Sequence, residues 1–197
     1  MDTDNRLLLI IDAQVDFLEG GKLAVKGAKG IMDDLARYID RYGKEYKNIV
    51  FTMDQHPIKH CSFKENGGEW PTHCLRYSEG AAIYEPLLQA AIKASKENVD
   101  LNIAFIEKGR NPIKEEYSAF DKDNSDNKLF FYNLVDFRGI KQIDVCGVAG
   151  DYCVLNSIQD LIKMGMGDKI NVMEDFTPSI DDGSTLHKFV EENNLKK

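Results

Sequence analysis

The sequence predicts an α/β fold, a three-layer sandwich with a mostly parallel central sheet. Five short apolar runs, most of them rich in Ile, Val or Phe, suit buried strands, because each run is too short to be a helix. Segments with helical periodicity lie between several of these runs, and alternation of strand and helix is typical of a sheet covered on both faces. No internal repeat, low-complexity tract or linker interrupts the chain, so we expect a single domain over residues 1–197.

The expected elements follow one another along the chain. The strands are RLLLIID (6–12), NIVFTMD (48–54), LNIAFIEK (101–108), QIDVCGVAG (142–150) and KINVMED (169–175). The first helix is expected over 30–46, with one face made of Ile31, Leu35, Tyr38, Ile39 and Tyr42. A second helix over 85–96 would bury Leu87, Leu88, Ala91 and Ile92, and a third over 153–167 would stop at its glycines. In 111–138 the polar DKDNSDNK stretch should form a surface loop before a helix of open limits.

The composition is that of an ordinary globular protein, with 43% hydrophobic and 29% charged residues. Its formal net charge is −8 and its 25 Lys and Arg residues are scattered, which argues against a nucleic-acid partner. No segment approaches the roughly 18 apolar residues of a membrane span, and the N-terminal MDTDNRLLLIIDAQ does not fit a signal peptide. The four cysteines do not form a dense disulfide framework, so we expect reduced thiols and a cytoplasmic location.

Charged and polar residues mark the ends of the expected strands. Asp12 ends the first strand, Asp54 the second and Lys108 the third, and a VAGDYC turn follows the fourth. In open α/β sheets the ligand crevice lies outside the carboxyl ends of the strands. The fold class therefore predicts that these groups converge on one rim.

The stretch DQHPIKHCSFKENGGEWPTHC (54–74) holds three of the four histidines and the only tryptophan. Asp54, His56 and His73 offer one carboxylate and two imidazoles, a set that suits Zn²⁺, Fe²⁺ or Mn²⁺ and leaves positions open for water or substrate. A blander interpretation is a turn-capping aspartate beside surface histidines. A rival site, closed and structural, would use the pairs His60–Cys61 and His73–Cys74, although adjacent residues rarely bind one ion together. The role of His60 is left open: it could be a fourth ligand, a residue that supports a ligand, or a plain loop residue.

Cys153 lies after a strand and at the start of an expected helix. The positive end of a helix dipole and its free N–H groups favour a thiolate and can hold an oxyanion. Asp12 could take the thiol proton, and Lys108 could stabilise the resulting negative charge. Taken singly, Cys153 is explained equally well as a buried filler, whereas Asp12 and Lys108 are better explained as a turn-capping acid and a solvated strand-end charge. Their common position on one expected rim favours nucleophilic catalysis.

The ordered motifs IDAQVDF, DQHPIKHCSF, EWPTHC, EKG, YSAF and CGVAGDYCV resemble those of the isochorismatase-like cysteine hydrolases, and the metal motif resembles the nicotinamidase branch. The resemblance implies hydrolysis of nicotinamide to nicotinate and ammonia through a cysteine thioester. Carried over to this sequence, the catalytic triad would be Asp12, Lys108 and Cys153. The ligands of one divalent ion, Zn²⁺ with Fe²⁺ or Mn²⁺ as alternatives, would be Asp54, His56 and His73.

The resemblance also implies a pocket for the substrate ring, lined by Phe17, Trp70 and Tyr117. A cis peptide between Val148 and Ala149 would aim the Ala149 and Cys153 amides as an oxyanion hole. The sequence departs from the family pattern at Gln55, where Trp is common, and at Gly150, where Thr is common. A glycine in place of this threonine would loosen the turn. The longer KGRNPIKEEYSAF spacing leaves the assignment of Tyr117 open.

Two alternatives to a nicotinamidase remain at the level of the sequence. One is another cysteine amidohydrolase of the same fold, acting on an N-carbamoyl or ureido substrate; such relatives generally lack the metal motif. The other is a non-catalytic interaction module that keeps the fold. The expected partners are a small-molecule amide and, where the chain self-associates, copies of itself in a homo-oligomer; neither nucleic acid nor a membrane is expected.

Overall fold

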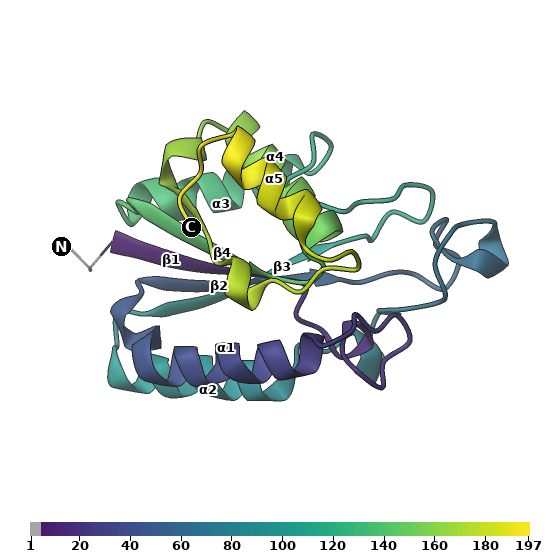
Figure 1. Ribbon diagram of the computed structural model, residues 1–197, viewed down its shortest axis with the longest axis horizontal. Coiled ribbons are helices and arrows are strands. Elements are labelled where there is room, and N and C mark those ends of the chain that lie inside the picture. Colours follow the sequence, from purple (N-terminus) through teal and green to yellow (C-terminus); the bar gives the residue numbers. More distant parts are fainter. Residues whose placement is uncertain (1–4) are drawn as a thin grey trace.

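The computed structural model describes residues 5–197 and has the three layers that the sequence predicts (Figure 1). The first four residues, part of the expected domain and of the N-terminal stretch considered above, lie outside this range. The strands are β1 (Arg6–Ile11), β2 (Asn48–Asp54), β3 (Asn102–Lys108), β4 (Gln142–Gly147) and β5 (Ile170–Val172). The helices are α1 (Ala28–Tyr42), α2 (Glu85–Glu97), α3 (Ser125–Phe137), α4 (Leu155–Lys163) and α5 (Ser184–Glu192). Within 5–197, no helix combines the length and apolarity needed to cross a membrane.

The sheet has the strand order β3-β2-β1-β4-β5, and all four strand pairs are parallel. This confirms the α/β prediction and extends it, because a mostly parallel sheet was expected and the structure has a fully parallel one. The chain first moves outward from β1 to β3 and then returns to place β4 on the other side of β1. The strand order therefore reverses between the neighbouring strands β1 and β4. Ligand crevices of α/β proteins form outside the carboxyl ends of the strands at such a reversal point.

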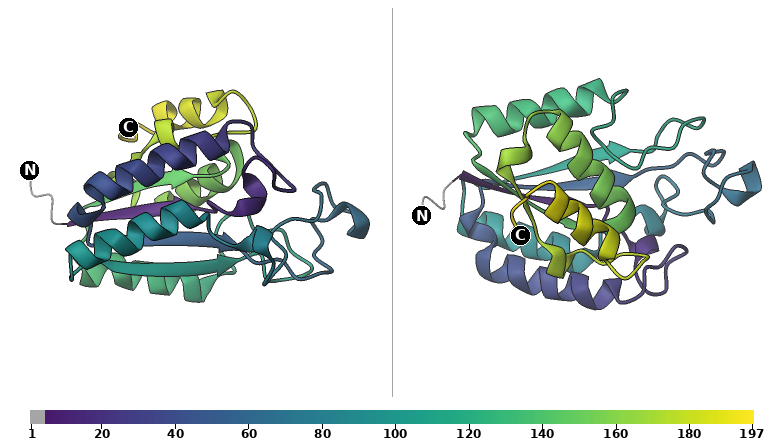
Figure 2. Two further views of the ribbon diagram at one scale, coloured as in Figure 1. Left: turned by 90° about the horizontal axis from the view of Figure 1, so that it is seen from below. Right: turned by 45° about the horizontal axis from the view of Figure 1, so that its top comes forward.

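Alternating residues of β1 feed two separate cores. Leu8 and Ile10 pack toward α1 and α2, while Leu7, Leu9 and Ile11 pack toward α3, α4 and α5, and all five are fully buried. Figure 2 shows these helices covering the two faces of the sheet. Because both faces are covered, the central strand is a continuous apolar run, as the sequence indicated.

Several helix boundaries and faces differ from the sequence predictions. Helix α1 begins at Ala28 rather than residue 30, and its fully buried stripe is Ala28, Met32, Leu35 and Ile39. Tyr42, expected on this face, is 38% exposed because the stripe turns away from it over the last turn. In α2 the buried residues include Ala90 and Ala94, whereas Leu88 and Ile92 are only half-buried.

The C-terminal half of the chain holds the larger corrections. The polar DKDNSDNK stretch is not entirely a loop, because α3 begins within it at Ser125 and places Asp126 in its first turn, where the helix dipole favours an acid. The helix expected over 153–167 is shorter, and a π-helical turn over Gly150–Val154 precedes α4. Helix α5 was not predicted; it buries only Leu186 and Val190, too few positions to give a clear periodic signal.

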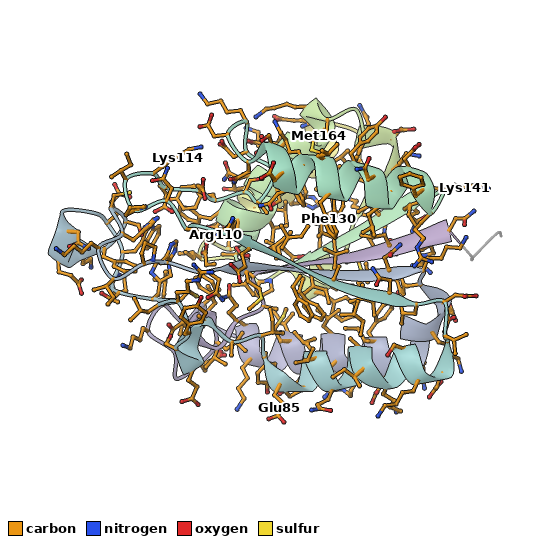
Figure 3. The ribbon with its side chains drawn as sticks, turned by 180° about the vertical axis from the view of Figure 1, so that it is seen from behind. Glu85, Arg110, Lys114, Phe130, Lys141 and Met164 are labelled. Atoms are coloured by element: carbon orange, nitrogen blue, oxygen red, sulfur yellow. The ribbon has the colours of Figure 1, made fainter. Side chains whose placement is uncertain are left out.

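The two ends of the sheet have different roles. In Figure 3, Lys141 marks the amino end of β4, whereas Arg110 and Lys114 lie on the segment that follows the carboxyl end of β3. At the amino end, the fully buried Asp144 accepts hydrogen bonds from Arg6 (2.6 Å), Tyr46 (2.8 Å) and the amides of Gln142 and Asn171 (2.7 Å each). This network joins β1, β4 and β5 to the segment before β2.

Replacing Asp144 with Ala should destabilise the protein by about 3 kcal/mol, because it leaves the Arg6 guanidinium and three other donors without their shared acceptor. Urea unfolding followed by circular dichroism measures the change. As a control, Asp40→Ala removes a solvent-exposed ion pair with Lys93 and should cost less than about 1 kcal/mol. Equal losses in the two variants would contradict a special role for the buried network.

Candidate active site

The carboxyl ends of four adjacent strands bring the predicted triad and a metal-ligand candidate together. Lys108 is the last residue of β3 and Asp54 the last of β2, and the two are paired in register. Asp12 follows β1 directly, and Cys153 lies in the π-helical turn that follows β4. The site therefore sits beside the reversal point of the sheet.

The ammonium group of Lys108 is the centre of this cluster. Its Nζ lies 2.9 Å from Asp12 Oδ2 and 2.6 Å from Asp54 Oδ1, donates to the Glu116 carbonyl at 3.1 Å, and lies 3.7 Å from Cys153 Sγ. The Lys108 side chain is only 1% exposed. Burial alone would lower its pKa, but the two carboxylates outweigh burial and raise the pKa well above its usual value. The group stays charged.

The two carboxylate oxygens of Asp12 have different partners, the Thr52 hydroxyl and the Lys108 ammonium. Its Oδ1 accepts a hydrogen bond from the Thr52 hydroxyl at 2.6 Å, and its left-handed backbone (φ 46°) turns the residue out of β1 toward the rim. Oδ2 lies beside Lys108, yet no donor in residues 5–197 is aligned on it for a hydrogen bond. Burial raises the pKa of Asp12 and outweighs the opposing effect of Lys108. A buried carboxylate with a raised pKa, close to a thiol, is suited to accept a proton.

Cys153 is a buried thiol rather than a ready thiolate. Burial raises its pKa well above the usual value, even though Lys108 acts in the opposite direction. Burial therefore opposes the effect that is expected from the helix start. The sulfur and carboxylate oxygens of Asp12 and Asp54 lie within 4.8 Å of one another, so a neighbouring base is at hand to remove the proton.

The three expected metal ligands also converge. Donor atoms of Asp54, His56 and His73 all lie within 4.8 Å of one another. The Nδ1–H groups of His56 and His73 donate to the carbonyls of Gly109 (2.9 Å) and Pro71 (2.8 Å), which assigns the free lone pair of each ring to Nε2. His56 Nε2 is buried and has no hydrogen-bond partner within 5–197, and it lies 3.6 Å from Asp54 Oδ2. These residues fit a divalent metal ion.

The ionisation of the ligands supports the same conclusion. Burial would raise the pKa of Asp54, but Lys108 and His56 outweigh it and hold the pKa well below its usual range. Burial lowers the pKa of His73, so that its ring is neutral at pH 7. For His56, Asp54 outweighs burial and raises the pKa, which means that a proton and a metal ion compete for the same nitrogen.

His60, whose role the sequence left open, packs behind His56. The ring centroids of the two histidines are 4.1 Å apart. Both nitrogens of His60 have polar partners, since Nδ1 lies 2.6 Å from Ser62 Oγ and Nε2 lies 3.1 Å from the Lys114 carbonyl. Burial, followed by the effect of His56, lowers the pKa of His60 to about 4, so that the ring is neutral. Its donor atoms also come within 4.8 Å of His56 and Glu115, without Asp54 or His73 in the same group.

The rival closed zinc site is not assembled. Within residues 5–197, no cluster of three candidate donors includes Cys61 or Cys74. The Cys74 sulfur instead faces the Gly80 carbonyl at 3.9 Å, and both nitrogens of His60 are engaged elsewhere. The adjacent residues His73 and Cys74 have different partners, in line with the physical objection to this site.

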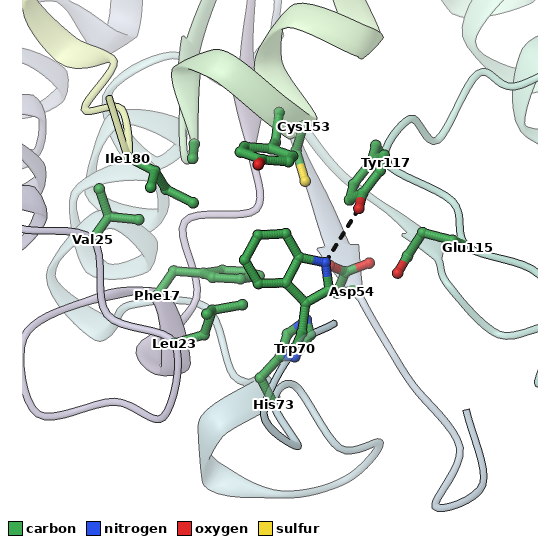
Figure 4. Close-up of a pocket in the computed structure, with 12 residues that line it drawn as sticks. Phe17, Leu23, Val25, Asp54, Trp70, His73, Glu115, Tyr117, Cys153 and Ile180 are labelled. Carbon is green, nitrogen blue, oxygen red and sulfur yellow. Dashed lines mark hydrogen bonds between the residues drawn. The ribbon is translucent and has the colours of Figure 1, made fainter. Parts of the chain in front are cut away.

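A pocket opens directly above the cluster, and the close-up in Figure 4 shows its lining. The three expected ring-binding residues, Phe17, Trp70 and Tyr117, all line it together with Cys153 and Ala149. Trp70 Nε1–H donates to the Tyr117 hydroxyl at 3.2 Å (Figure 4), which fixes the position of Tyr117 that the sequence left open.

Sequence reasoning missed other pocket residues, most clearly Tyr152 and Glu115. The Tyr152 ring contacts Trp70 and Tyr117, with centroids 5.3 and 5.5 Å apart. Tyr152 directly precedes the candidate nucleophile Cys153 in the sequence, and this position could have identified it as a pocket residue. Aliphatic side chains of Leu23, Val25 and Ile180 form the wall beside Phe17, and Glu115 lies on the opposite side with Tyr117 (Figure 4).

The turn that carries Cys153 has the expected cis peptide between Val148 and Ala149. Gly150 does not leave this turn loose, because its N–H donates to the Pro178 carbonyl at 2.9 Å. A Cβ at position 150 would lie 2.2 Å from Ser179 Oγ. The segment after β5 therefore occupies the space that a side chain at 150 would need.

Comparison with known proteins gives a consistent result. The isochorismatase domain matches residues 6–190. The nicotinamidase of Escherichia coli is 32% identical over 185 residues, covering 86% of this chain and 81% of that protein. PnC1 from L. infantum, solved in complex with nicotinate, is 31% identical with a TM-score of 0.80 and coverage of 98% and 92%. The pyrazinamidase of Pyrococcus horikoshii, solved in complex with zinc, is 29% identical with a TM-score of 0.73 and coverage of 96% and 94%.

Replacing Gly109 with Ala should weaken metal binding by about ten- to hundredfold. A Cβ at this position would lie 2.5 Å from His56 Cε1 and 2.9 Å from Asp54 Oδ1, so two ligands must move. Competition with a chromophoric chelator measures the affinity. The control is Gly139→Ala, which has a similar left-handed backbone (φ +61° against +68°) but nothing within 4 Å of the new Cβ. Equal affinity in the two variants would disprove the steric argument.

Proposed function

The chain belongs to the isochorismatase family, and from this premise we propose that it is a nicotinamidase, an amidohydrolase that converts nicotinamide to nicotinate and ammonia. The observation that carries the proposal is a buried thiol, carboxylate and ammonium beneath a pocket whose wall also presents Asp54 and His73. Near-full-length similarity to a nicotinamidase and to a protein solved with nicotinate supports this substrate. We further propose that residues 1–197 form one hydrolase domain, of which the family match covers 6–190.

Asp54, His56 and His73 would hold one divalent metal ion, with Zn²⁺ preferred over Fe²⁺ or Mn²⁺. One carboxylate and two imidazoles with free Nε2 atoms are ligands that Zn²⁺ accepts, and the similar P. horikoshii pyrazinamidase was solved with zinc. When bound, the ion supplies an electrophilic site for the ring nitrogen of the pyridine.

The aromatic side chains would hold the substrate ring. Phe17 packs against His73 with ring centroids 5.6 Å apart, which places it at the edge of the metal-ligand cluster. Trp70, Tyr117 and Tyr152 contact one another and close the other side of the pocket. A flat heteroaromatic ring gains contact area on such surfaces, and in this pocket its carboxamide can face Cys153.

In the first half of the reaction, Asp12 takes the proton of the Cys153 thiol as the sulfur attacks the carboxamide carbon. Lys108 stabilises the negative charge that develops near the sulfur. The oxygen of the tetrahedral intermediate would be held by the N–H groups of Ala149 and Cys153, and each such donor contributes about 3 kcal/mol in related chemistry. Asp12 returns its proton to the leaving nitrogen, the C–N bond breaks, and ammonia departs from a Cys153 thioester.

In the second half, a water molecule takes the place of ammonia. Asp12 accepts a proton from this water as the water oxygen attacks the carbonyl carbon of the thioester. The C–S bond breaks and the sulfur regains a proton from Asp12. The product carboxylic acid loses its remaining proton to solvent and leaves as nicotinate. The raised pKa of Asp12 suits this alternation, because a carboxylate that both takes and gives a proton works best with a pKa nearer to neutrality.

The pocket also favours this activity over the alternatives. Its aromatic walls and adjoining metal-ligand cluster suit a heteroaromatic amide better than an N-carbamoyl or ureido compound. A non-catalytic module would have no need for three buried charged groups around a thiol. Ammonia release from nicotinamide, pyrazinamide and an N-carbamoyl amino acid tests the choice; release from the carbamoyl compound alone, or from none of the three, would refute the proposal.

Replacing Cys153 with Ala should reduce ammonia release from nicotinamide by at least about 10³-fold, because no other group forms the thioester. Circular dichroism and metal content should match those of the unaltered protein. Cys146→Ala is the control, since this buried cysteine lies within β4 and its sulfur faces the Leu9 carbonyl rather than the pocket. Turnover that survives in the Cys153 variant would remove the thiol from the mechanism.

Stripping metal with a chelator should abolish activity without unfolding the chain. The ligands are held by the protein itself, since Lys108 binds Asp54, and backbone carbonyls hold His56 and His73. A thermal melt of the stripped protein and its reactivation by Zn²⁺, Fe²⁺ or Mn²⁺ provide the two measurements. Cooperative unfolding on chelation would instead indicate a structural metal site.

A further inference from the structure

Glu116 is a buried acid that is not among the pocket-lining residues and does not belong to the predicted triad or metal ligands. Its residue is 6% exposed. It follows Glu115 on the segment after β3, and this segment folds back so that Glu116 reaches the end of that strand. A buried carboxylate needs a compensating partner, and here the partner is a backbone N–H beside two functional side chains.

The partner is Gly109, whose N–H donates to Glu116 Oε2 at 2.8 Å. On the other side of the same Cα atom, the Gly109 carbonyl accepts the Nδ1–H of His56 at 2.9 Å. Gly109 has no side chain to restrict its backbone (φ +68°), and none would fit, because His56 packs directly against its Cα. The hydrogen bond that Gly109 donates to Glu116 therefore restrains a glycine that would otherwise be free to rotate, and with it the carbonyl that orients His56.

The main chain of Glu116 contacts Lys108, the residue that precedes Gly109. Its carbonyl accepts a hydrogen bond from Lys108 Nζ at 3.1 Å, the third polar contact of that ammonium besides Asp12 and Asp54. The side chain of Glu116 thus holds the backbone of Gly109, which orients the imidazole of His56. The main-chain carbonyl of Glu116 holds the ammonium of Lys108 beside the thiol.

We propose that Glu116 is a positioning residue for both halves of the site, setting the Nε2 lone pair of His56 for the metal ion and the ammonium of Lys108 for the reacting sulfur. The assignment rests on the proposed nicotinamidase function for the role of Lys108, but its effect on metal binding does not require amide hydrolysis. The hydrogen-bond geometry, rather than the negative charge, is the property that Glu116 contributes, because its carboxylate meets a neutral backbone N–H.

Three substitutions separate geometry from charge. Glu116→Gln keeps an acceptor oxygen at the same reach, and its metal affinity should stay within about threefold of the unaltered protein. Glu116→Asp keeps the charge but shortens the side chain by one methylene, and Glu116→Ala removes the acceptor; both should bind Zn²⁺ about tenfold more weakly or worse. Competition with a chromophoric chelator, using Zn²⁺ alone, measures all three. If Asp rescues binding and Gln does not, charge rather than position is responsible and the proposal fails.

Ser118→Ala is the matched control. Ser118 is a buried polar residue of the same segment, and its hydroxyl accepts the Phe120 N–H at 3.0 Å without contacting Gly109 or Lys108. This variant should lose thermal stability while keeping the metal affinity of the unaltered protein. Equal weakening of metal binding by Ser118→Ala and Glu116→Ala would reduce Glu116 to a general structural role and overturn the assignment.

Steady-state kinetics with nicotinamide at saturating Zn²⁺ provide the second measurement. Glu116→Ala should lower kcat by about tenfold or more with a smaller change in KM. Loss of the side-chain hydrogen bond to Gly109 frees the Glu116 main chain, whose carbonyl then holds Lys108 beside the reacting sulfur less firmly. Unchanged kcat would refute the effect on Lys108. If the unaltered protein hydrolyses no amide and the metal affinities still follow the predicted order, the proposed function falls and the positioning of His56 by Glu116 stands.

Discussion

A single buried ammonium decides the layout of this site. Asp12 and Asp54 lie at the carboxyl ends of the neighbouring strands β1 and β2, and both are buried. Two carboxylates cannot both stay ionised in such surroundings without a shared positive charge. Lys108 binds one oxygen of each. Asp54 keeps an oxygen for the imidazole of His56, while Asp12 keeps a carboxylate close to the sulfur of Cys153. The ammonium therefore divides one charged cluster into the half that we propose to bind the metal ion and the half that we propose to transfer protons.

The resting charges follow from this division. Asp54 is held ionised by Lys108 and His56, whereas burial pushes Asp12 and Cys153 toward their protonated forms. A proton that moves from the thiol to Asp12 leaves the total charge of the buried cluster unchanged. Such a transfer is compatible with a site of low dielectric constant, because the net charge of the buried cluster does not change.

The sequence predicted the parts of this arrangement that depend on strand ends. The apolar runs located the strands, and the fold class then placed Asp12, Asp54 and Lys108 on one rim, where the structure has them. The segments without strong periodicity were harder, as α5 and the early start of α3 show. The direction of the Cys153 pKa shift was also out of reach, since it depends on how completely the surrounding side chains exclude water.

The strand order also has a consequence for how the protein is made. Strand β1 lies between β2 and β4, and β4 leaves the ribosome only after α1, β2, α2, β3 and α3. Until then, β1 has one unpaired edge and the emerging chain carries Asp12, Asp54 and Lys108 without the residue that would react with a substrate. Non-local pairing of this kind is slow and leaves apolar edges open to wrong partners. With Cys153 as the proposed nucleophile, the nascent chain has no activity during the same interval in which the edge of β1 is open to wrong partners, and both conditions end after β4 docks.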